Sequence, residues 1–175
     1  MRLWQNKLRL VSLIILIVFW AHNFLWPEKV LATFAQVDKV VVIKSKRLMI
    51  LLQNGEILKT YRIALGKQPV GHKTREGDQK TPEGSYILNS RNVKSKYHLS
   101  ITISYPNESD ILKAQEQGVS PGGSIMIHGL PEDLESLGKL HRTLDWTNGC
   151  IAVTNSEIEE IWQLVPDGTQ IEIKP

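Results

Sequence analysis

His128 and Cys150 are the two residues of this chain best suited to covalent chemistry. Cys150 is the only cysteine, 22 residues after His128 and directly behind a glycine. A thiol attacks acyl carbons as the thiolate, so it needs a neighbouring base and amide N–H groups that receive the developing oxyanion. His128 would be the base, oriented by a carbonyl at the turn to Gly129. Gly149 lets the chain turn sharply, so the amides of Asn148, Gly149 and Cys150 would converge on one oxygen. On spacing alone, a buried structural cysteine stays the alternative.

The elements that must position this pair are mostly strands. Apolar and β-branched runs separated by turn residues predict them, and Asn54-Gly55 is a strong hairpin signal that indicates a three-stranded meander at the start of the domain. His128 ends one predicted strand, and Cys150 lies in a loop that leads into the apolar residues Ile151 and Val153. The predicted strands cover residues 39–43, 48–52, 57–64, 84–88, 99–103, 124–128 and 170–173.

Short helices and one long loop complete the predicted domain. We expect a helix over 110–117 capped by Ser109 or Asp110, a short acidic helix over 131–140, and a helix over 158–165 opened by a capping box from Ser156 to Glu159. Residues 66–83 combine glycines and prolines with charges. A connection of that length in a compact domain is usually functional or a lid.

Charge and composition exclude two classes of protein. The net charge is +3, and residues 1–36 carry that excess, so the remaining chain is neutral and a basic nucleic-acid module is excluded. With 42% hydrophobic residues the chain is not disordered. Residues 37–100 hold 13 Lys/Arg and 5 Asp/Glu, whereas 101–175 hold 4 and 12. Either the two halves interleave in the fold and their charges mix, or the first half builds a cationic wall suited to an anionic polymer.

The N-terminus indicates export. Arg2, Lys7 and Arg9 precede an apolar stretch over residues 8–26. This pattern is typical of a secretory signal, and 19 residues also suffice for an uncleaved membrane anchor. Both readings stay open, and both place the domain outside the cytoplasm, in the periplasm or cell envelope. We therefore divide the chain into a signal or anchor with a short linker over 1–36 and a catalytic domain over 37–175.

Three motifs in order resemble a known family. Ile127-His128-Gly129 and Thr147-Asn148-Gly149-Cys150-Ile151 are similar to the His-Gly and Ser/Thr-x-Gly-Cys motifs of the L,D-transpeptidase catalytic domain of the YkuD type. Upstream, Thr81-Pro82-Glu83-Gly84-Ser85-Tyr86 is similar to that family's Thr-Pro-x-Gly-x-aromatic motif. The resemblance covers about residues 38–174 and makes a catalytic role the expected one for the single cysteine.

The resemblance implies a fold and a mechanism. The fold is a mainly β, sandwich- or barrel-like domain with a few short helices, here preceded by an N-terminal hydrophobic helix. The activity is attack by Cys150 on a diaminopimelate-containing peptidoglycan stem peptide at an L,D bond, followed by acyl transfer to an amine. His128 is then the general base, the Gly129 carbonyl orients its ring, and the amides of Asn148, Gly149 and Cys150 form the oxyanion hole. No cofactor, metal or nucleic acid is implied, and the inner membrane is a partner only if the N-terminal segment is uncleaved.

Departures from the family pattern leave the reaction outcome open. Many members have His where this chain has Asn148 and Arg where it has Ala152. The spacing from His128 to Cys150 is also longer than in common members, and the Thr-Asn-Gly-Cys-Ile-Ala variant resembles a sub-branch with some peptidoglycan hydrolases. We therefore expect a transpeptidase first, a carboxypeptidase or amidase second, and a non-catalytic wall-binding module third.

Substrate contacts are the least constrained part of the prediction. Thr147 beside the nucleophile, Tyr105 after a predicted strand, and His141 in the long insert are candidates, as are Lys73 and Arg75 in the loop, which would hold carboxylates. A zinc site from the two histidines and the cysteine would need a fourth ligand such as Asp145, and the spacings match no regular metal pattern.

Overall fold

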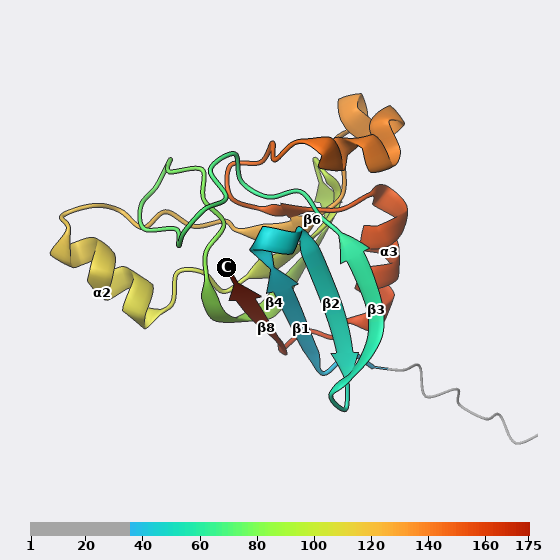
Figure 1. Ribbon diagram of the computed structural model, residues 1–175, viewed down its shortest axis with the longest axis horizontal. Coiled ribbons are helices and arrows are strands. Elements are labelled where there is room, and N and C mark those ends of the chain that lie inside the picture. Colours follow the sequence, from blue (N-terminus) through green and yellow to red (C-terminus); the bar gives the residue numbers. More distant parts are fainter. Residues whose placement is uncertain (1–35) are drawn as a thin grey trace, which may run out of the picture. The chain divides into compact units, whose positions relative to one another are not determined.

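The computed structural model describes residues 36–175. In that part of the chain eight strands form one mixed sheet in the order β3-β2-β1-β8-β4-β5-β6-β7 (Figure 1). The strands are β1 (Lys39–Ile43), β2 (Leu48–Gln53), β3 (Glu56–Arg62), β4 (Gly84–Ser95), β5 (His98–Ile103), β6 (Met126–His128), β7 (Ile151–Ala152) and β8 (Thr169–Lys174). The helical segments are η1 (Lys44–Lys46), α2 (Glu108–Glu116), η2 (Glu132–Thr143) and α3 (Asn155–Leu164). This curled sheet with few helices confirms the mainly β class.

The expected meander opens the domain. β1, β2 and β3 pair antiparallel in sequence order. Asn54 and Gly55 have φ values of 52° and 81°, as a tight hairpin turn between right-twisted strands requires. The last strand then enters the middle of the sheet: β8 pairs parallel with β1 and antiparallel with β4. Because β8 lies between strands of the first half, the opposite charges of the two halves are brought together.

Ion pairs across the sheet show that mixing. Four of them join the cationic first half of the domain to the acidic second half: Lys39–Glu172, Arg47–Asp145, Lys59–Glu160 and Arg91–Asp167. These four pairs confirm that charges of the two halves mix in the described domain. Asp145, which was a conceivable zinc ligand, is held by the Arg47 guanidinium at 2.7 Å.

The core lies on the inner face of the curled sheet. Alternate residues of the strands are buried, with Val40 and Val42 of β1 and Ile171 and Ile173 of β8 as examples, as the period of two in a half-buried strand requires. Helix α3 covers this face with its buried residues Ile158 and Ile161, while α2 lies at the other end of the molecule (Figure 1).

Helix starts differ from the sequence prediction. Asn107 caps α2, its side chain accepting from the Asp110 amide at 3.0 Å, so the prediction of Ser109 or Asp110 was wrong. Thr154 caps α3 in a capping box with Glu157, not Ser156 with Glu159. In both cases two or more neighbouring polar residues could occupy the N-cap position. The N-cap residue has extended backbone, and the path of the preceding chain determines which of them adopts it.

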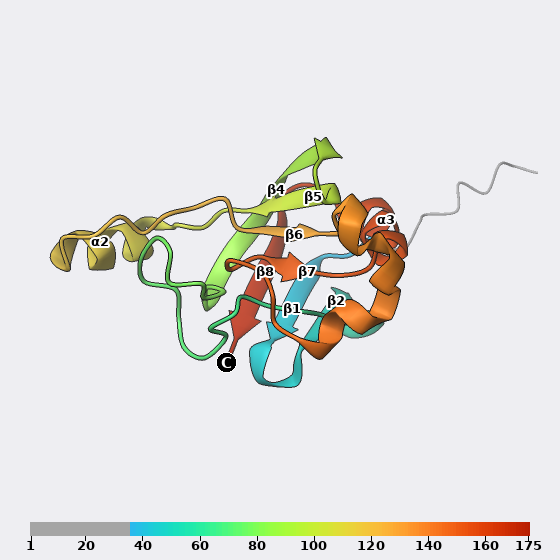
Figure 2. The ribbon, with the colours of Figure 1, turned by 90° about the horizontal axis from the view of Figure 1, so that it is seen from above.

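The insert between the two motifs also differs from expectation. Residues 132–143 form the 3₁₀ segment η2, which breaks at Gly138 (φ 46°, ψ −123°), in place of one short α-helix over 131–140. Figure 2 shows η2 beside α3. Arg142 of η2 pairs with Glu157 in the first turn of α3, which anchors the insert to that helix.

The predicted N-terminal hydrophobic helix lies outside the described residues, and so does the signal or anchor over 1–36 apart from its last residue. Across residues 36–175, every helix is too short or too polar to cross a bilayer.

Candidate active site

Strands β6 and β7 place His128 and Cys150 on the same face of the sheet. The two strands pair parallel, with Ile127 opposite Ile151 and His128 opposite Ala152. Side chains alternate along a strand, so Cys150, two residues before Ala152, points to the side on which His128 lies. Both residues line one cavity. The strand-terminal histidine and the cysteine before the apolar pair are thus brought together as the sequence predicted.

The imidazole of His128 is fixed on three sides. Its Nδ1 donates to the carbonyl oxygen of Gly129 at 2.6 Å. The ring stacks on Tyr97, with 4.3 Å between centroids and 25° between planes, and meets the edge of Trp146 at 5.8 Å. A carbonyl can only accept, so the ring proton is on Nδ1 and the basic nitrogen is Nε2. The ring is 1% exposed, which leaves it little freedom to rotate.

Burial keeps both members of the pair uncharged at rest. It lowers the pKa of His128 from 6.5 to about 4. The hydrogen bond to Gly129 raises this pKa, but by less than burial lowers it. Burial also raises the pKa of the Cys150 thiol above its ordinary value of 9.0, although the Met126 amide and the charges of Lys73 and Lys96 act in the opposite direction. The desolvation of the charged forms dominates in both residues.

Gly129 is required by the close approach of three segments. A Cβ at this position would lie 2.6 Å from Oδ1 of Asn155 and 3.0 Å from the carbonyl oxygen of Tyr97. The same Asn155 oxygen accepts from the Leu130 amide at 2.7 Å. The His-Gly motif therefore lets α3 and the β4–β5 turn approach the strand end that carries the imidazole.

The turn before Cys150 is built by Thr147. Its hydroxyl accepts from the Gly149 amide at 3.1 Å and donates to the carbonyl oxygen of Cys150 at 2.8 Å. Gly149 has φ of +130°, and a Cβ there would lie 2.6 Å from the Lys80 carbonyl oxygen. Of the three amides expected in the oxyanion hole, that of Gly149 is thus engaged by Thr147. In the described domain the amides of Asn148 and Cys150 have no protein acceptor.

The upstream motif supports this turn from behind. Ala64 exchanges backbone hydrogen bonds with Ala152, and the Thr147 amide donates to Leu65. The Gly66 amide donates to the Thr81 hydroxyl at 3.1 Å. The threonine of the Thr-Pro-x-Gly motif therefore fixes the segment that supports the turn before Cys150, although it lies far from Cys150 in the sequence.

The cavity around the pair has a volume of about 430 Å³ and a one-sided charge. Its lining contains two lysines and no carboxylate. The lining residues are Lys67, Lys96, Tyr97, Gly123, Ser124, Ile125, Met126, His128, Trp146, Thr147, Asn148 and Cys150. A site of this kind favours an anionic ligand.

Four of the residues expected to contact substrate lie elsewhere. Tyr105 is buried and its hydroxyl donates to the Pro121 carbonyl at 3.0 Å. Lys73 is 3% exposed and holds Asp78 at 2.8 Å, so its charge is used inside the loop. Arg75 is exposed outside the cavity lining. His141 is 4% exposed and accepts from the Trp146 indole at 3.4 Å. Only Thr147 of the five candidates lines the cavity.

The sequence prediction missed eight of the twelve lining residues, among them Lys67, Lys96, Tyr97 and Trp146. Trp146 directly precedes the cysteine motif, which was a usable signal. Tyr97 and Lys96 lie in the turn between β4 and β5, a part of the chain to which the sequence analysis assigned no role. The pairing of Ser100 in β5 with His128 in β6 brings that turn to the site.

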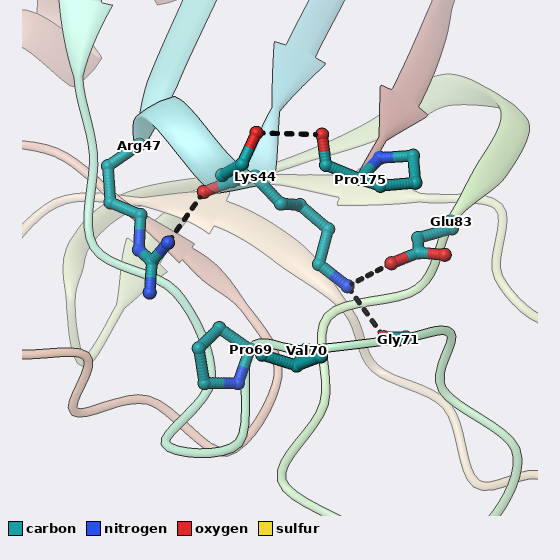
Figure 3. A pocket seen from close by; sticks show the side chains of 8 residues that line it. Lys44, Arg47, Pro69, Val70, Gly71, Glu83 and Pro175 are labelled. Atoms are coloured by element: carbon teal, nitrogen blue, oxygen red, sulfur yellow. Dashed lines mark hydrogen bonds and ion pairs between the residues drawn. The ribbon is translucent and has the colours of Figure 1, made fainter.

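A second cavity of about 160 Å³ lies around Lys44 and is structural (Figure 3). The Lys44 ammonium donates to the carbonyls of Gly71 and Thr81 and to the Glu83 carboxylate, at 2.7, 2.8 and 2.9 Å. Its three N–H groups are all used, so none is left for a ligand. The residue instead ties η1 to the long loop. In residues 36–175, no cluster of three or more His, Cys, Asp or Glu is placed to hold a metal.

Comparison with known proteins agrees with this geometry. The chain is 35% identical over 112 residues to YafK of Escherichia coli (strain K12), which covers 63% of this chain and 38% of YafK. The crystal structure of the helical cell shape determining protein Pgp2 from Campylobacter jejuni is 30% identical, with a TM-score of 0.60 over 79% of this chain and 48% of that one. Bd1075 of Bdellovibrio bacteriovorus is 27% identical, with a TM-score of 0.56 over 81% and 49%. The chain thus spans half or less of these relatives. Residues 38–173 match the model of the L,D-transpeptidase catalytic domain (YkuD), and the chain belongs to that family.

Proposed function

We propose that this protein is an L,D-transpeptidase that remodels peptidoglycan through a Cys150 acyl-enzyme. The observation that carries the proposal is the shared cavity in which the His128 ring, fixed by Gly129 at 2.6 Å, keeps Nε2 available on the face where Cys150 lies. The family acts on peptidoglycan stem peptides, and we assign a diaminopimelate-containing stem peptide as the acyl donor. A role in crosslinking, and through it in cell shape, follows from that activity.

The reaction proceeds in two balanced steps. His128 Nε2 takes the thiol proton as Cys150 Sγ attacks the carbonyl carbon, and the amides of Asn148 and Cys150 stabilise the oxyanion. The C–N bond then breaks, the imidazolium gives its proton to the leaving amine, and a thioester remains. An acceptor amine next attacks the thioester carbon and loses a proton to His128. The C–S bond breaks, and the thiolate recovers that proton.

Hydrolysis is the second candidate outcome, favoured by one observation. The cavity lining holds two lysines and no carboxylate, so no lining residue attracts an acceptor in its ammonium form. Water then competes for the thioester, as it would in a carboxypeptidase or amidase of the variant sub-branch. A non-catalytic wall-binding module is the third candidate. Binding alone does not require a thiol and an oriented imidazole in one cavity, so this arrangement favours the two enzymes.

Incubation of the full-length protein with purified muropeptides tests the proposal, with products resolved by mass. A D-amino acid titrated into the reaction should raise exchanged product at the expense of hydrolysed product. Cys150→Ala should abolish both. His128→Ala should lose about 10²- to 10⁴-fold in rate, which is the usual contribution of a general base. His98→Ala, which alters an exposed histidine at the start of β5, serves as the matched control. Hydrolysed product alone at every acceptor concentration would establish the hydrolase, and turnover by Cys150→Ala would refute a cysteine enzyme.

We further propose that residues 1–36 export the domain over 37–175 and that it works outside the cytoplasm. The basic residues before the apolar stretch 8–26 support this. A reporter active only in the cytoplasm, fused after residue 175, should be inactive, and its activity would contradict export. The mass of the mature chain distinguishes a cleaved signal from an anchor in the inner membrane.

A further inference from the structure

The imidazole of His128 must become positively charged in the proposed reaction, and its surroundings oppose that charge. The ring is 1% exposed, and burial disfavours its charged form. The ammonium of Lys96 also lowers the pKa of His128. Within residues 36–175 the ring pairs with no carboxylate, and its hydrogen-bond partner there is the Gly129 carbonyl. A neutral group must therefore supply part of the stabilisation that a carboxylate would give.

The Tyr97 side chain lies face to face with this imidazole. The two ring centres are 4.3 Å apart, and the ring planes are inclined by 25°. An aromatic face carries negative charge density and attracts a cation that lies within about 6 Å of the ring centre. The Trp146 indole meets the imidazole at 69° and 5.8 Å. Of these two aromatic neighbours, Tyr97 is the one that stacks on the ring.

The turn between β4 and β5 holds Tyr97 in this position. The Tyr97 amide donates to the Ser95 hydroxyl at 3.1 Å. Just beyond the turn, the Leu99 carbonyl accepts from the Gly129 amide at 3.2 Å. A Cβ at position 129 would lie 3.0 Å from the Tyr97 carbonyl oxygen, so glycine at this position lets the turn come close. The same glycine therefore orients the imidazole through its carbonyl and admits the tyrosine that stacks on it.

We propose that the face of Tyr97 stabilises the imidazolium form of His128 while Cys150 is acylated. This inference rests on the proposed acyl-enzyme function. As Cys150 Sγ attacks the acyl carbon, the thiol proton moves to His128 Nε2 and the stacked ring becomes a cation. The quadrupole of Tyr97 attracts this cation more strongly than the neutral imidazole, so the contact favours the transition state over the resting enzyme. Tyr97 is a positioning residue, because it acts through His128 and not on the reacting atoms.

The burial of the imidazole sets the size of the expected effect. Cation–π contacts are stronger where the cation is desolvated than at an exposed surface. Loss of the aromatic face in Tyr97→Leu should therefore slow the acylation of Cys150 by about 10- to 30-fold. Because leucine also changes the packing against His128, a second set of variants must keep the shape of the ring.

Fluorination of the ring separates its charge distribution from its packing. The full-length protein is prepared with phenylalanine, 4-fluorophenylalanine, 3,5-difluorophenylalanine or 3,4,5-trifluorophenylalanine at position 97. Each added fluorine withdraws charge from the ring face and changes the ring shape little. The same substitutions at Tyr61, a buried tyrosine of β3 outside the cavity lining, form the matched control.

Rapid mixing with p-nitrophenyl acetate measures the acylation step without a muropeptide. Cys150 Sγ bonds to the acetyl carbon, the C–O bond breaks, and p-nitrophenolate leaves while the thiol proton is held by His128. The logarithm of this rate should fall in step with fluorination at position 97 and stay constant across the series at position 61. The trifluorinated ring should approach the rate of Tyr97→Leu, and the free energy of unfolding in denaturant should not follow the trend.

A rate that does not fall with fluorination would overturn the inference, even if Tyr97→Leu is slow, because packing alone would then explain that loss. Failure of the proposed function gives a different result: the fluorination trend would be present while the wild-type protein turns over no muropeptide. Turnover of muropeptides without the trend would refute the role of Tyr97 and leave the proposed function intact. Absence of Cys150 acylation in the wild-type protein would overturn both.

Discussion

The resting protonation state of His128 and Cys150 is open to a direct test. Burial lowers the pKa of His128 to about 4 and raises that of Cys150 above 9.0. The pKa of the thiol therefore lies well above that of the imidazole, and each pKa unit of that separation adds about 1.4 kcal/mol to the cost of moving the thiol proton to the imidazole before substrate binds. We expect a neutral thiol beside a neutral imidazole, not a thiolate–imidazolium pair.

Alkylation by iodoacetamide measures this state. Cys150 is the only cysteine, so the mass of a single adduct reports it without ambiguity. Because the thiolate is the reactive form, the logarithm of the rate should rise with pH at a slope near one from pH 5 to beyond pH 9. N-acetylcysteine provides the reference, and its rate should level off earlier than that of the protein.

A plateau between pH 5 and pH 8 would refute the expectation, because an ion pair keeps the thiolate fraction constant between its two pKa values. The neutral state also has a mechanistic consequence. His128 must then take the proton during the attack, as a general base does, and the oxyanion donors must stabilise charge that is absent in the free enzyme.

Three further predictions concern the support of the site. Lowering the pH should destabilise the fold, because His128 takes up a proton near pH 6.5 in the unfolded chain but only near pH 4 in the folded one. This difference contributes about 3 kcal/mol to the free energy of unfolding above pH 6.5, and the contribution is lost by pH 4. Denaturant unfolding at both pH values measures it. His141→Phe should flatten that pH dependence, because burial lowers the pKa of His141 to about 4 as well; an unchanged pH profile would contradict this. Gly149→Ala should lose about 1–3 kcal/mol of stability, because alanine is strained at φ +130°. Activity should fall as well, because the turn before Cys150 shifts. Wild-type stability in this variant would contradict the strain.

Local signals were enough to predict most of the sheet and to single out His128 and Cys150, which the structure places at one cavity. Asn54-Gly55 predicted the hairpin because its turn chemistry is independent of the rest of the fold. The strand ending at His128 and the apolar residues after Cys150 were recognisable for the same reason. The boundaries were less certain: the strand predicted over 84–88 extends to Ser95, because pairing with β5 continues past the part with apolar alternation.

Tertiary context decided what the sequence could not. His141 was a candidate substrate contact in the long insert, yet its ring is buried against Trp146. Lys73 looked like a free cation in a loop, but Asp78 folds the loop around it. Neither outcome has a local signature, since both depend on how a segment returns to the sheet.

The distribution of charge along the chain could be read from the sequence, but its arrangement in the fold could not. A basic first half and an acidic second half are compatible both with a cationic wall and with mixed charges. The insertion of β8 between β1 and β4 determines the answer, because it brings Glu172 to Lys39 and neutralises the sheet. Lys67 and Lys96 form no ion pair in the described residues, and both line the cavity around Cys150. Because that lining carries no carboxylate, its charge favours an anionic ligand.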